Sequence, residues 1–264
     1  MSMDKVLEVI NLTLNFGGLC ALDNVCLEIN KGEIAALIGP NGAGKTTLFN
    51  CLTGIYKPDA GDIFIYPPQG KQHRLNNLKI NQITALGIAR TFQNIRLFSG
   101  MTVLENVMIG RHCRSGAGIA GAILRDNGTR DEENLIVNDS YRILEIIGLD
   151  SYVNDLAKNL PYGAQRRLEI ARALATEPFL LLLDEPAAGM NPQETKELEK
   201  LIYQLRDDLN LSILLIEHDM KLVMNLAQNI FVLDYGEEIA RGTPQEIRQN
   251  PAVIKAYLGV EASA

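Results

Sequence analysis

A glycine-rich stretch at residues 39–47, which reads Gly-Pro-Asn-Gly-Ala-Gly-Lys-Thr-Thr, carries the clearest chemistry in this sequence. Its spacing fits the pattern G-x-x-x-x-G-K-[ST], and it lies between a short apolar run and a segment of helical character. A strand, a turn and a helix N-terminus bring several backbone N–H groups to one point, where the helix dipole favours negative charge. We therefore predict that the loop binds a chain of phosphates. The alternative is a glycine-rich turn that binds nothing.

We expect the residues of this loop to have different roles in phosphate binding. Lys45 would reach the β- and γ-phosphates, and the Thr46 hydroxyl would bind Mg²⁺. The glycines would let the backbone approach the phosphates closely. The predicted phosphate contacts are Gly39, Pro40, Asn41, Gly42, Ala43, Gly44, Lys45, Thr46 and Thr47.

Two carboxylates follow a wholly apolar run at Phe179–Leu183. A strand that is buried on both faces is typical of a parallel sheet, and ligands of such sheets bind at the carboxyl ends of the strands. Asp184 and Glu185 are therefore expected at the ligand edge, where they form either a solvated acidic pair or, beside the phosphate loop, a catalytic one. His218 follows a second buried run, Ser212–Ile216. A lone histidine is more often structural, but this position points to the same edge.

Phe16 is a candidate for contact with a nucleotide base. Phe16 comes directly before the Gly17-Gly18 turn, at the end of a predicted strand. Its ring could stack on an adenine face, an interaction worth about 1 to 3 kcal/mol in nucleic-acid systems. A core aromatic residue at the end of the strand is the alternative, and the sequence does not decide between the two.

Periodicity and turn residues predict alternating strands and helices around these motifs. The predicted strands are Val6–Phe16, Val25–Ile29, Glu33–Ile38, Asp62–Tyr66, Phe179–Leu183, Ser212–Ile216, Ile230–Asp234 and Glu238–Arg241. The predicted helices are Lys45–Thr53, Ile83–Arg90, segments within Thr102–Tyr152, Leu168–Ala175, Gln193–Asp208, Met220–Ala227 and most of Pro244–Leu258. The segment Arg114–Glu133, rich in glycine and charge, is expected to be a mobile insertion.

Composition narrows the class of protein. The chain has 264 residues, and its 47% hydrophobic content supplies a full core. A net charge of −7 argues against nucleic acid as a partner. No apolar run approaches the roughly 18 to 20 residues of a membrane span, and no secretory signal is visible. The four cysteines show no C-x-x-C pairing and are expected to be reduced core residues.

The order of motifs resembles that of the ATP-binding subunits of ABC transporters, and the resemblance covers nearly the whole chain. The motifs are the phosphate loop, an isolated glutamine, a glycine-bearing signature, the Asp-Glu strand end and the strand-end histidine. Within that family, several stretches are similar to the ATPases of branched-chain amino-acid importers: Phe49–Pro58, Arg90–Phe98, Asp184–Pro192, Glu217–Met224 and Asn250–Gly259.

The resemblance implies an α/β fold of the P-loop NTPase class, ABC type. This fold has a mixed, mostly parallel sheet core, an antiparallel β-subdomain and an inserted helical subdomain. It also implies one ATPase domain over residues 1–264, in which residues 1–92 and 158–264 form the nucleotide-binding core and residues 93–157 form the helical subdomain.

The same resemblance implies roles for single residues, with ATP and Mg²⁺ as the cofactors. Asp184 would hold Mg²⁺ through water, and Glu185 would orient or deprotonate the attacking water. Gln93 looks like the glutamine that reaches Mg²⁺, and His218 resembles the histidine that contacts the γ-phosphate. The expected catalytic residues are thus Glu185, His218, Gln93 and Lys45, and the expected metal-binding residues are Thr46, Gln93 and Asp184.

The signature segment departs from the family pattern Leu-Ser-Gly-Gly-Gln. Pro161, Tyr162, Gly163 and Ala164 follow Leu160, so a serine hydroxyl and one backbone N–H are lost at Pro161. Because Gly163 and the following helix N-terminus remain, Pro161, Tyr162 and Gly163 are still expected to contact nucleotide across a dimer. Asn191 stands where the wider family often has aspartate.

These expectations describe an ATPase at the cytoplasmic face of the cell membrane, bound there peripherally. Two subunits, identical or paralogous, would enclose two ATP·Mg²⁺, and their closure would drive transmembrane permease subunits. A periplasmic or extracellular binding protein would be an indirect partner. The segment Arg96–Phe98 would receive the permease.

Several alternatives remain open at this point. They are an ATPase for urea or another amide, one for lipopolysaccharide, a soluble ABC ATPase without a transport role, and a regulatory module that does not hydrolyse ATP. An unrelated phosphate-loop kinase or GTPase is a further alternative, of which the GTPase is disfavoured because no Asn-Lys-x-Asp guanine-reading motif follows the loop.

Overall fold

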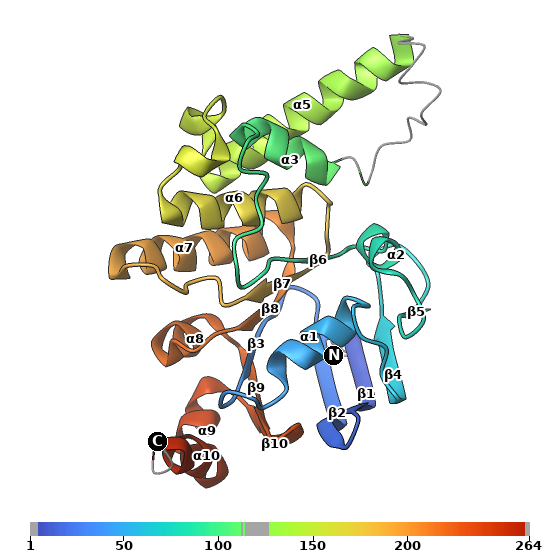
Figure 1. Ribbon diagram of the computed structural model, residues 1–264, viewed down its shortest axis with the longest axis vertical. Helices are drawn as coiled ribbons and strands as arrows, with labels where there is room; N and C mark the ends of the chain where they lie inside the picture. Colours follow the sequence, from blue (N-terminus) through green and yellow to red (C-terminus); the bar gives the residue numbers. More distant parts are fainter. Residues whose placement is uncertain (1–4, 112, 114–126, 262–264) are drawn as a thin grey trace. The chain divides into compact units, whose positions relative to one another are not determined.

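The computed structural model describes residues 5–111, 113 and 127–261 (Figure 1). These residues form two compact units, one made of the chain up to Arg90 together with Phe179 onward, and the other of Thr91–Pro178. The second boundary lies later than the predicted end of the helical part at residue 157, because the helix that begins within the signature segment, at Tyr162, packs with the helical unit. The assignment of nucleotide binding to residues 1–92 and 158–264, and of a helical subdomain to residues 93–157, stays a prediction.

The first unit contains a mixed sheet with the strand order β10-β9-β3-β8-β7-β6, in which only β10 runs antiparallel to its neighbour. The strands are β3 (Ile34–Ile38), β6 (Ile88–Arg90), β7 (Leu180–Asp184), β8 (Ser212–Ile216), β9 (Asn229–Asp234) and β10 (Glu237–Gly242). All residues of β3, β7 and β8 are buried, as expected for strands covered on both faces.

Strand register brings the predicted site residues to one edge of this sheet. Leu37 of β3 and Asp184 of β7 both lie opposite Ile216 of β8. Since the three strands are parallel, the chain that follows each of them emerges at the same carboxyl edge. The phosphate loop, the Asp-Glu pair and the strand-end histidine therefore start from neighbouring points.

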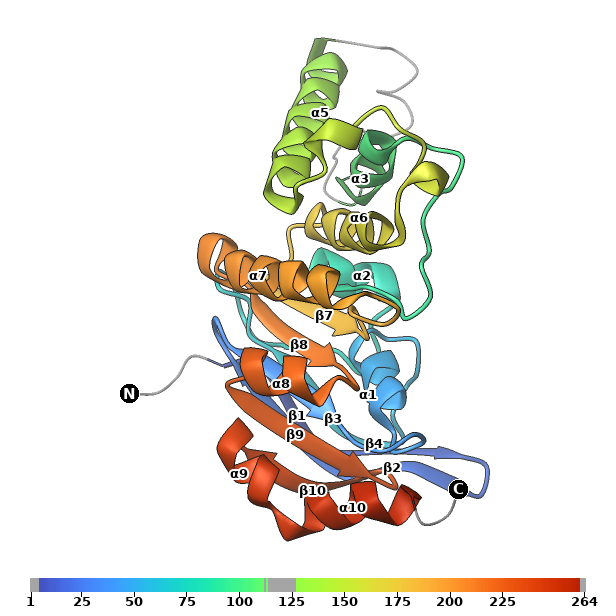
Figure 2. The same ribbon diagram turned by 90° about the vertical axis from the view of Figure 1, so that its left-hand side faces the viewer.

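A second, antiparallel sheet has the order β2-β1-β4-β5, with β1 (Lys5–Phe16), β2 (Leu19–Asn30), β4 (Ala60–Ile65) and β5 (His73–Arg74). Its inner residues join α1 (Lys45–Leu52) and one face of the parallel sheet in a common core. Leu48 and Phe49 of α1 are fully buried there. Figures 1 and 2 show α1 and the antiparallel sheet on one face of the parallel sheet.

The remaining helices of this unit are α2 (Ile80–Ala85), α7 (Pro192–Leu209), α8 (Met220–Leu226), α9 (Pro244–Gln249) and α10 (Pro251–Glu261). Figure 2 shows α7 and α8 on the face opposite α1, and α9 and α10 beside β9 and β10. Three of these helices start with a side-chain cap that accepts backbone N–H groups: Asn191 for α7, Asp219 for α8 and Thr243 for α9.

The helical unit is built on α3 (Val103–Arg111), α5 (Asn127–Ile147) and α6 (Tyr162–Leu174), with short turns η2 (Asp150–Tyr152) and η3 (Ala157–Asn159). Helix α3 packs on both α5 and α6 (Figure 1). The approach is close at Gly110, where an added Cβ would lie 2.3 Å from the Arg172 carbonyl oxygen. Arg111 then pairs with Asp139 of α5 at 2.7 Å and with Glu177.

The structure corrects several sequence predictions. The predicted helix Ile83–Arg90 is wrong in its second half, because Gly87 (φ 103°) ends the turn after α2 and Ile88–Arg90 pairs with β7 as an edge strand. Only Cys51 is a buried cysteine, whereas Cys20 and Cys113 are exposed, so the expectation of core cysteines is wrong for these two. Of the predicted mobile segment Arg114–Glu133, residues 114–126 lie outside the described residues, and residues 127–133 begin α5.

Among the described residues, no helix has the length and the apolar character that crossing a bilayer requires.

Candidate nucleotide-binding site

The phosphate loop connects β3 to α1, and its glycines are required by the backbone around it. Gly39 has φ 149°, and a Cβ there would lie 2.0 Å from the Leu233 carbonyl oxygen of β9. Gly44 has φ 100°, and a Cβ there would lie 2.6 Å from the Ala21 carbonyl oxygen of β2. The loop therefore lies directly against two neighbouring strands, which only glycine allows at these positions.

The turn between β9 and β10 also holds this loop. The Gly236 N–H donates to the Ala43 carbonyl at 3.1 Å, and the Gly236 carbonyl accepts from the Asp23 N–H at 2.8 Å. The turn thus connects the phosphate loop to β2.

Lys45 is the first residue of α1 and is buried beneath the loop. Its Nζ donates to the carbonyl oxygens of Gly39 at 2.7 Å and Pro40 at 2.8 Å. Burial lowers the pKa of Lys45, while the charges of Glu185 and Asp184 act in the opposite direction. Strand register places the loop and the strand-end carboxylates at the same edge of the sheet.

Asp184 ends β7 and is buried in an ion pair that the sequence did not reveal. Its Oδ2 accepts from the Arg90 Nη2 at 2.6 Å, and both side chains are almost inaccessible. Arg90 also donates from Nη1 to Asn50 Oδ1 of α1 at 2.7 Å. Arg90 thus connects β6, α1 and the predicted metal-binding aspartate through one guanidinium group.

Glu185 has an unusual backbone conformation. Its φ of 49° lies in the left-handed region, which costs a non-glycine residue energy and is concentrated at functional sites. Its N–H donates to the Ile216 carbonyl of β8 at 2.9 Å. The Glu185 Oε1 lies 3.0 Å from His218 Nε2, so the two predicted catalytic side chains are in contact.

Glu217 is a second residue that the sequence prediction missed. It is only 4% exposed, and its two carboxylate oxygens accept from the backbone N–H of Ala187 at 2.7 Å and of His218 at 3.1 Å. Burial raises the pKa of Glu217, and hydrogen bonds from the Ala187, His218 and Asp219 backbone act against that rise. Its carboxylate joins the loop after β7 to the end of β8, which are the two segments that carry Glu185 and His218.

The residues of this edge fit a magnesium triphosphate. Helix α1 has no side-chain cap and no acidic residue in its first turn, so its N-terminal N–H groups suit an anion. Thr46 is exposed in that first turn, and the Asp184 carboxylate lies close enough to Lys45 to influence its pKa. Hydroxyl, carboxylate and phosphate oxygens are the ligands that Mg²⁺ prefers.

Phe16 ends β1 and is 45% exposed. Its ring meets the Tyr56 ring edge-on, with the ring centroids 5.2 Å apart. This exposure excludes a fully buried core position, and adenine stacking stays a prediction.

The other predicted site residues belong to the helical unit. Gln93 lies in an exposed bend near the start of that unit. Pro161 is the N-cap of α6 and contributes no side-chain cap, Gly163 is buried, and Tyr162 is 42% exposed. The Tyr162 hydroxyl accepts from the guanidinium of Arg166 one helical turn later, at 3.1 Å from Nε and 2.9 Å from Nη2. Their contacts with nucleotide stay predictions.

Asn191 has an observed role within its own chain. Its Oδ1 accepts from the N–H groups of Gln193 at 2.9 Å and Glu194 at 3.0 Å, and so caps α7.

Comparison with known proteins identifies the family. The ABC transporter family matches residues 22–188, and a family described as the branched-chain amino acid ATP-binding cassette transporter matches residues 237–263. The chain is 50% identical over 254 residues to the high-affinity branched-chain amino acid transport ATP-binding protein LivG of Salmonella typhimurium, which covers 96% of this chain and 98% of that protein. It is 46% identical over 254 residues to BraF of Pseudomonas aeruginosa, with the same coverage.

Solved structures agree with this assignment. The ADP conformation of MJ1267, an ATP-binding cassette of an ABC transporter, matches with a TM-score of 0.82 and 32% identity, covering 97% of this chain and 99% of that chain. The chain therefore belongs to the family of ABC transporter ATP-binding subunits, and it is an ATPase. The resemblance and the fold class predicted from the order of motifs are confirmed.

Proposed function

We propose that this subunit hydrolyses ATP to drive the import of branched-chain amino acids through membrane permease subunits. The relatives LivG and BraF carry that substrate in their names, as does the family that matches residues 237–263. The observation that best supports the chemistry is the meeting of Lys45, Asp184, Glu185 and His218 at one edge of the parallel sheet.

Each residue at that edge takes one role in the proposal. The loop N–H groups and Lys45 bind the phosphates, while Thr46, Asp184 and Gln93 hold Mg²⁺, which when bound neutralises charge on the phosphate oxygens. Glu185 orients or deprotonates the attacking water, and His218 contacts the γ-phosphate. Phe16 stacks on the adenine.

A second ATPase subunit completes the site in this proposal. Pro161, Tyr162 and Gly163 of each copy face the nucleotide of the other, and the α6 N-terminus, which has no side-chain cap, supplies an anion-binding dipole. The first unit acts as the nucleotide-binding core and Thr91–Pro178 as the helical subdomain.

The helical unit offers a surface that suits the permease. Phe98 is 47% exposed and Met101 is 38% exposed, although both are large and apolar. The buried Asn106 accepts from the Phe98 N–H at 2.9 Å and donates to the Phe98 carbonyl at 3.1 Å. Because the backbone of this segment is fixed, its apolar side chains stay presented to a partner at the cytoplasmic face of the membrane. A binding protein on the other side would deliver the substrate.

Transport assays with Glu185→Gln test the proposal. We expect vesicles that carry the subunit, its permeases and binding protein to take up leucine, isoleucine and valine. Glu185→Gln should still bind ATP, while phosphate release and uptake fall to background. The exposed Glu197→Gln on α7 is the matched control and should behave as wild type.

Two results would overturn different parts of the proposal. Normal phosphate release by Glu185→Gln would reject Glu185 as the residue that activates water. ATP-driven uptake of urea or another amide, without uptake of the branched-chain amino acids, would reject the substrate class while leaving the ATPase intact.

A further inference from the structure

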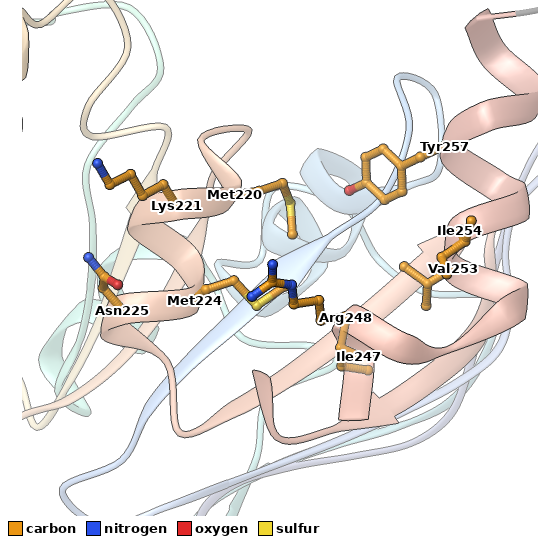
Figure 3. A pocket seen from close by; sticks show the side chains of 9 residues that line it. All are labelled: Met220, Lys221, Met224, Asn225, Ile247, Arg248, Val253, Ile254 and Tyr257. Carbon is orange, nitrogen blue, oxygen red and sulfur yellow. The ribbon is translucent and has the colours of Figure 1, made fainter. Parts of the chain in front are cut away.

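A cavity of about 540 Å³ lies away from the phosphate edge, between α8 and the two C-terminal helices α9 and α10 (Figure 3). This size is within the range of pockets that bind small molecules. Its apolar lining includes Met220 and Met224 from α8, Ile247 from α9 and Val253 from α10. Methionine side chains are flexible and polarisable, so this wall can adapt to an aliphatic ligand.

The charged side chains described around the cavity are all cationic. Figure 3 shows Arg248 extending from α9 towards α8, whereas Lys221 and Asn225 point away from the centre. Among the described residues, none of those that line the cavity is acidic. Within the described part of the chain, neither Arg248 nor Lys221 forms an ion pair. A ligand with one negative charge and an apolar body would match the cationic Arg248 and the apolar lining of the cavity.

Two of the helices that line the cavity lead to residues of the catalytic edge. Tyr257 lines the cavity from α10, where burial raises the pKa of its hydroxyl, and the backbone of Gly39, the first residue of the phosphate loop, acts to lower that pKa. The α8 wall begins at Met220, two residues after His218, and Asp219 caps that helix by accepting from the Lys221 N–H at 2.9 Å. A ligand between α8 and α10 would therefore contact residues that adjoin both the loop and the histidine.

We propose that this cavity binds a small aliphatic monocarboxylate, with its carboxylate on Arg248 and its apolar body between Met220, Met224 and Val253. Because none of the described lining side chains is an acid, an α-ammonium group gains no carboxylate partner among them. The site therefore prefers a plain or 2-oxo carboxylic acid to the amino acid of the same carbon skeleton. Occupancy alters the ATP site through Tyr257 and Gly39.

Methyl NMR on the full-length subunit tests the binding step. With methionine methyl groups labelled and no nucleotide present, 4-methyl-2-oxopentanoate should shift the Met220 and Met224 resonances saturably, and L-leucine should bind more weakly. A branched amine of the same length should not bind. Arg248→Gln should weaken the apparent affinity about tenfold or more, since hydrogen bonds to charged groups are the stronger ones. Lys255→Gln, on an exposed position of α10, is the matched control.

Three results of this experiment would overturn the site. They are the absence of saturable shifts at millimolar carboxylate, equal shifts from the amine and the carboxylate, and an unchanged affinity in Arg248→Gln. If L-leucine bound as tightly as the 2-oxo acid, the ligand class would be wrong.

The coupling step is measured separately and rests on the proposed ATP site. The affinity for a fluorescent ATP analogue should change when the carboxylate is added, and by reciprocity the analogue should change the carboxylate affinity by the same factor. Tyr257→Phe keeps the ring and removes the hydroxyl, so it should abolish this mutual effect. An unchanged analogue affinity would reject the coupling, whereas failure of the analogue to bind at all would reject the ATP site and leave the carboxylate site standing.

Discussion

Glu185 Oε1 and His218 Nε2 lie 3.0 Å apart, although the two residues follow different strands, β7 and β8. The contact depends on a third carboxylate beneath it, because Glu217 accepts N–H groups from both segments that carry the pair. In addition, Glu185 has a left-handed backbone that its hydrogen bond to the Ile216 carbonyl holds in place. The geometry of the proposed catalytic pair is therefore set by the backbone around it.

Glu217→Gln should lower kcat about tenfold or more and change KM for ATP little. An amide has one accepting oxygen where the carboxylate has two, so one backbone N–H is left facing a donor, which costs roughly 1 to 3 kcal/mol. Steady-state phosphate release measures both constants. Rescue by Glu217→Asp would be incomplete, since the shorter side chain cannot reach both N–H groups. A normal kcat in Glu217→Gln would contradict the positioning role.

Arg90→Met should destabilise the first unit by about 3 kcal/mol or more, because it removes the partner of a buried carboxylate. It should also shift the Mg²⁺ dependence of ATP hydrolysis, since Asp184 is the proposed metal ligand. Urea unfolding and a magnesium titration measure the two effects. Adding Asp184→Asn to Arg90→Met should recover part of the lost stability, and additive losses in the double variant would argue against a direct pair.

Glu169 gives the helical unit a dependence on pH. It is 3% exposed, its Oε1 accepts from the Arg96 N–H at 2.7 Å, and burial raises the pKa of its carboxyl above the usual 4.5. The folded state binds this proton more tightly than the unfolded chain. The stabilising contribution is thus complete below the usual pKa and is lost as pH rises through the raised one.

Glu169→Gln should therefore flatten the fall in unfolding free energy with rising pH. Urea unfolding at a series of pH values from about 4 to 7 measures the slope. The exposed Glu197→Gln variant is the comparison. If wild type and Glu169→Gln showed the same slope, the raised pKa would be wrong.

Gly110→Ala should destabilise the helical unit by about 1 to 3 kcal/mol, because its methyl group would meet the Arg172 backbone, which cannot move aside cheaply. Gly100→Ala in the same unit is the matched control, since a Cβ there meets nothing within 4 Å. Thermal unfolding of the two variants compares them directly. Equal melting temperatures would mean that α3 and α6 do not pack as described.

The phosphate loop and the strands that end at it could be predicted from the sequence because their signals are local. The spacing of residues 39–47 and the apolar runs before Asp184 and His218 each fix one element and its end. Parallel pairing then places those ends at one edge without further information. For this reason the sequence alone predicts that Lys45, Asp184, Glu185 and His218 lie near that edge, while their roles stay predictions.

The missed residues depend on contacts between distant parts of the chain. Arg90 reaches Asp184 across 94 positions, and it does so only because Ile88–Arg90 is an edge strand and not the predicted helix. A short apolar run of this kind fits a helix end or a strand equally well. The hydrogen-bond partners of Glu217 likewise require the folded arrangement, although a carboxylate directly before a strand-end histidine was a signal for this residue.

The turn between β9 and β10 is a suitable place for a label that reports whether nucleotide is bound. Tyr235 is 87% exposed, and the adjacent Gly236 is bonded to Ala43 inside the phosphate loop. An environment-sensitive fluorophore attached at residue 235 would sense changes in the loop without altering any side chain of residues 39–47. The same turn cannot accept inserted tags, because lengthening it would pull on the loop that it anchors.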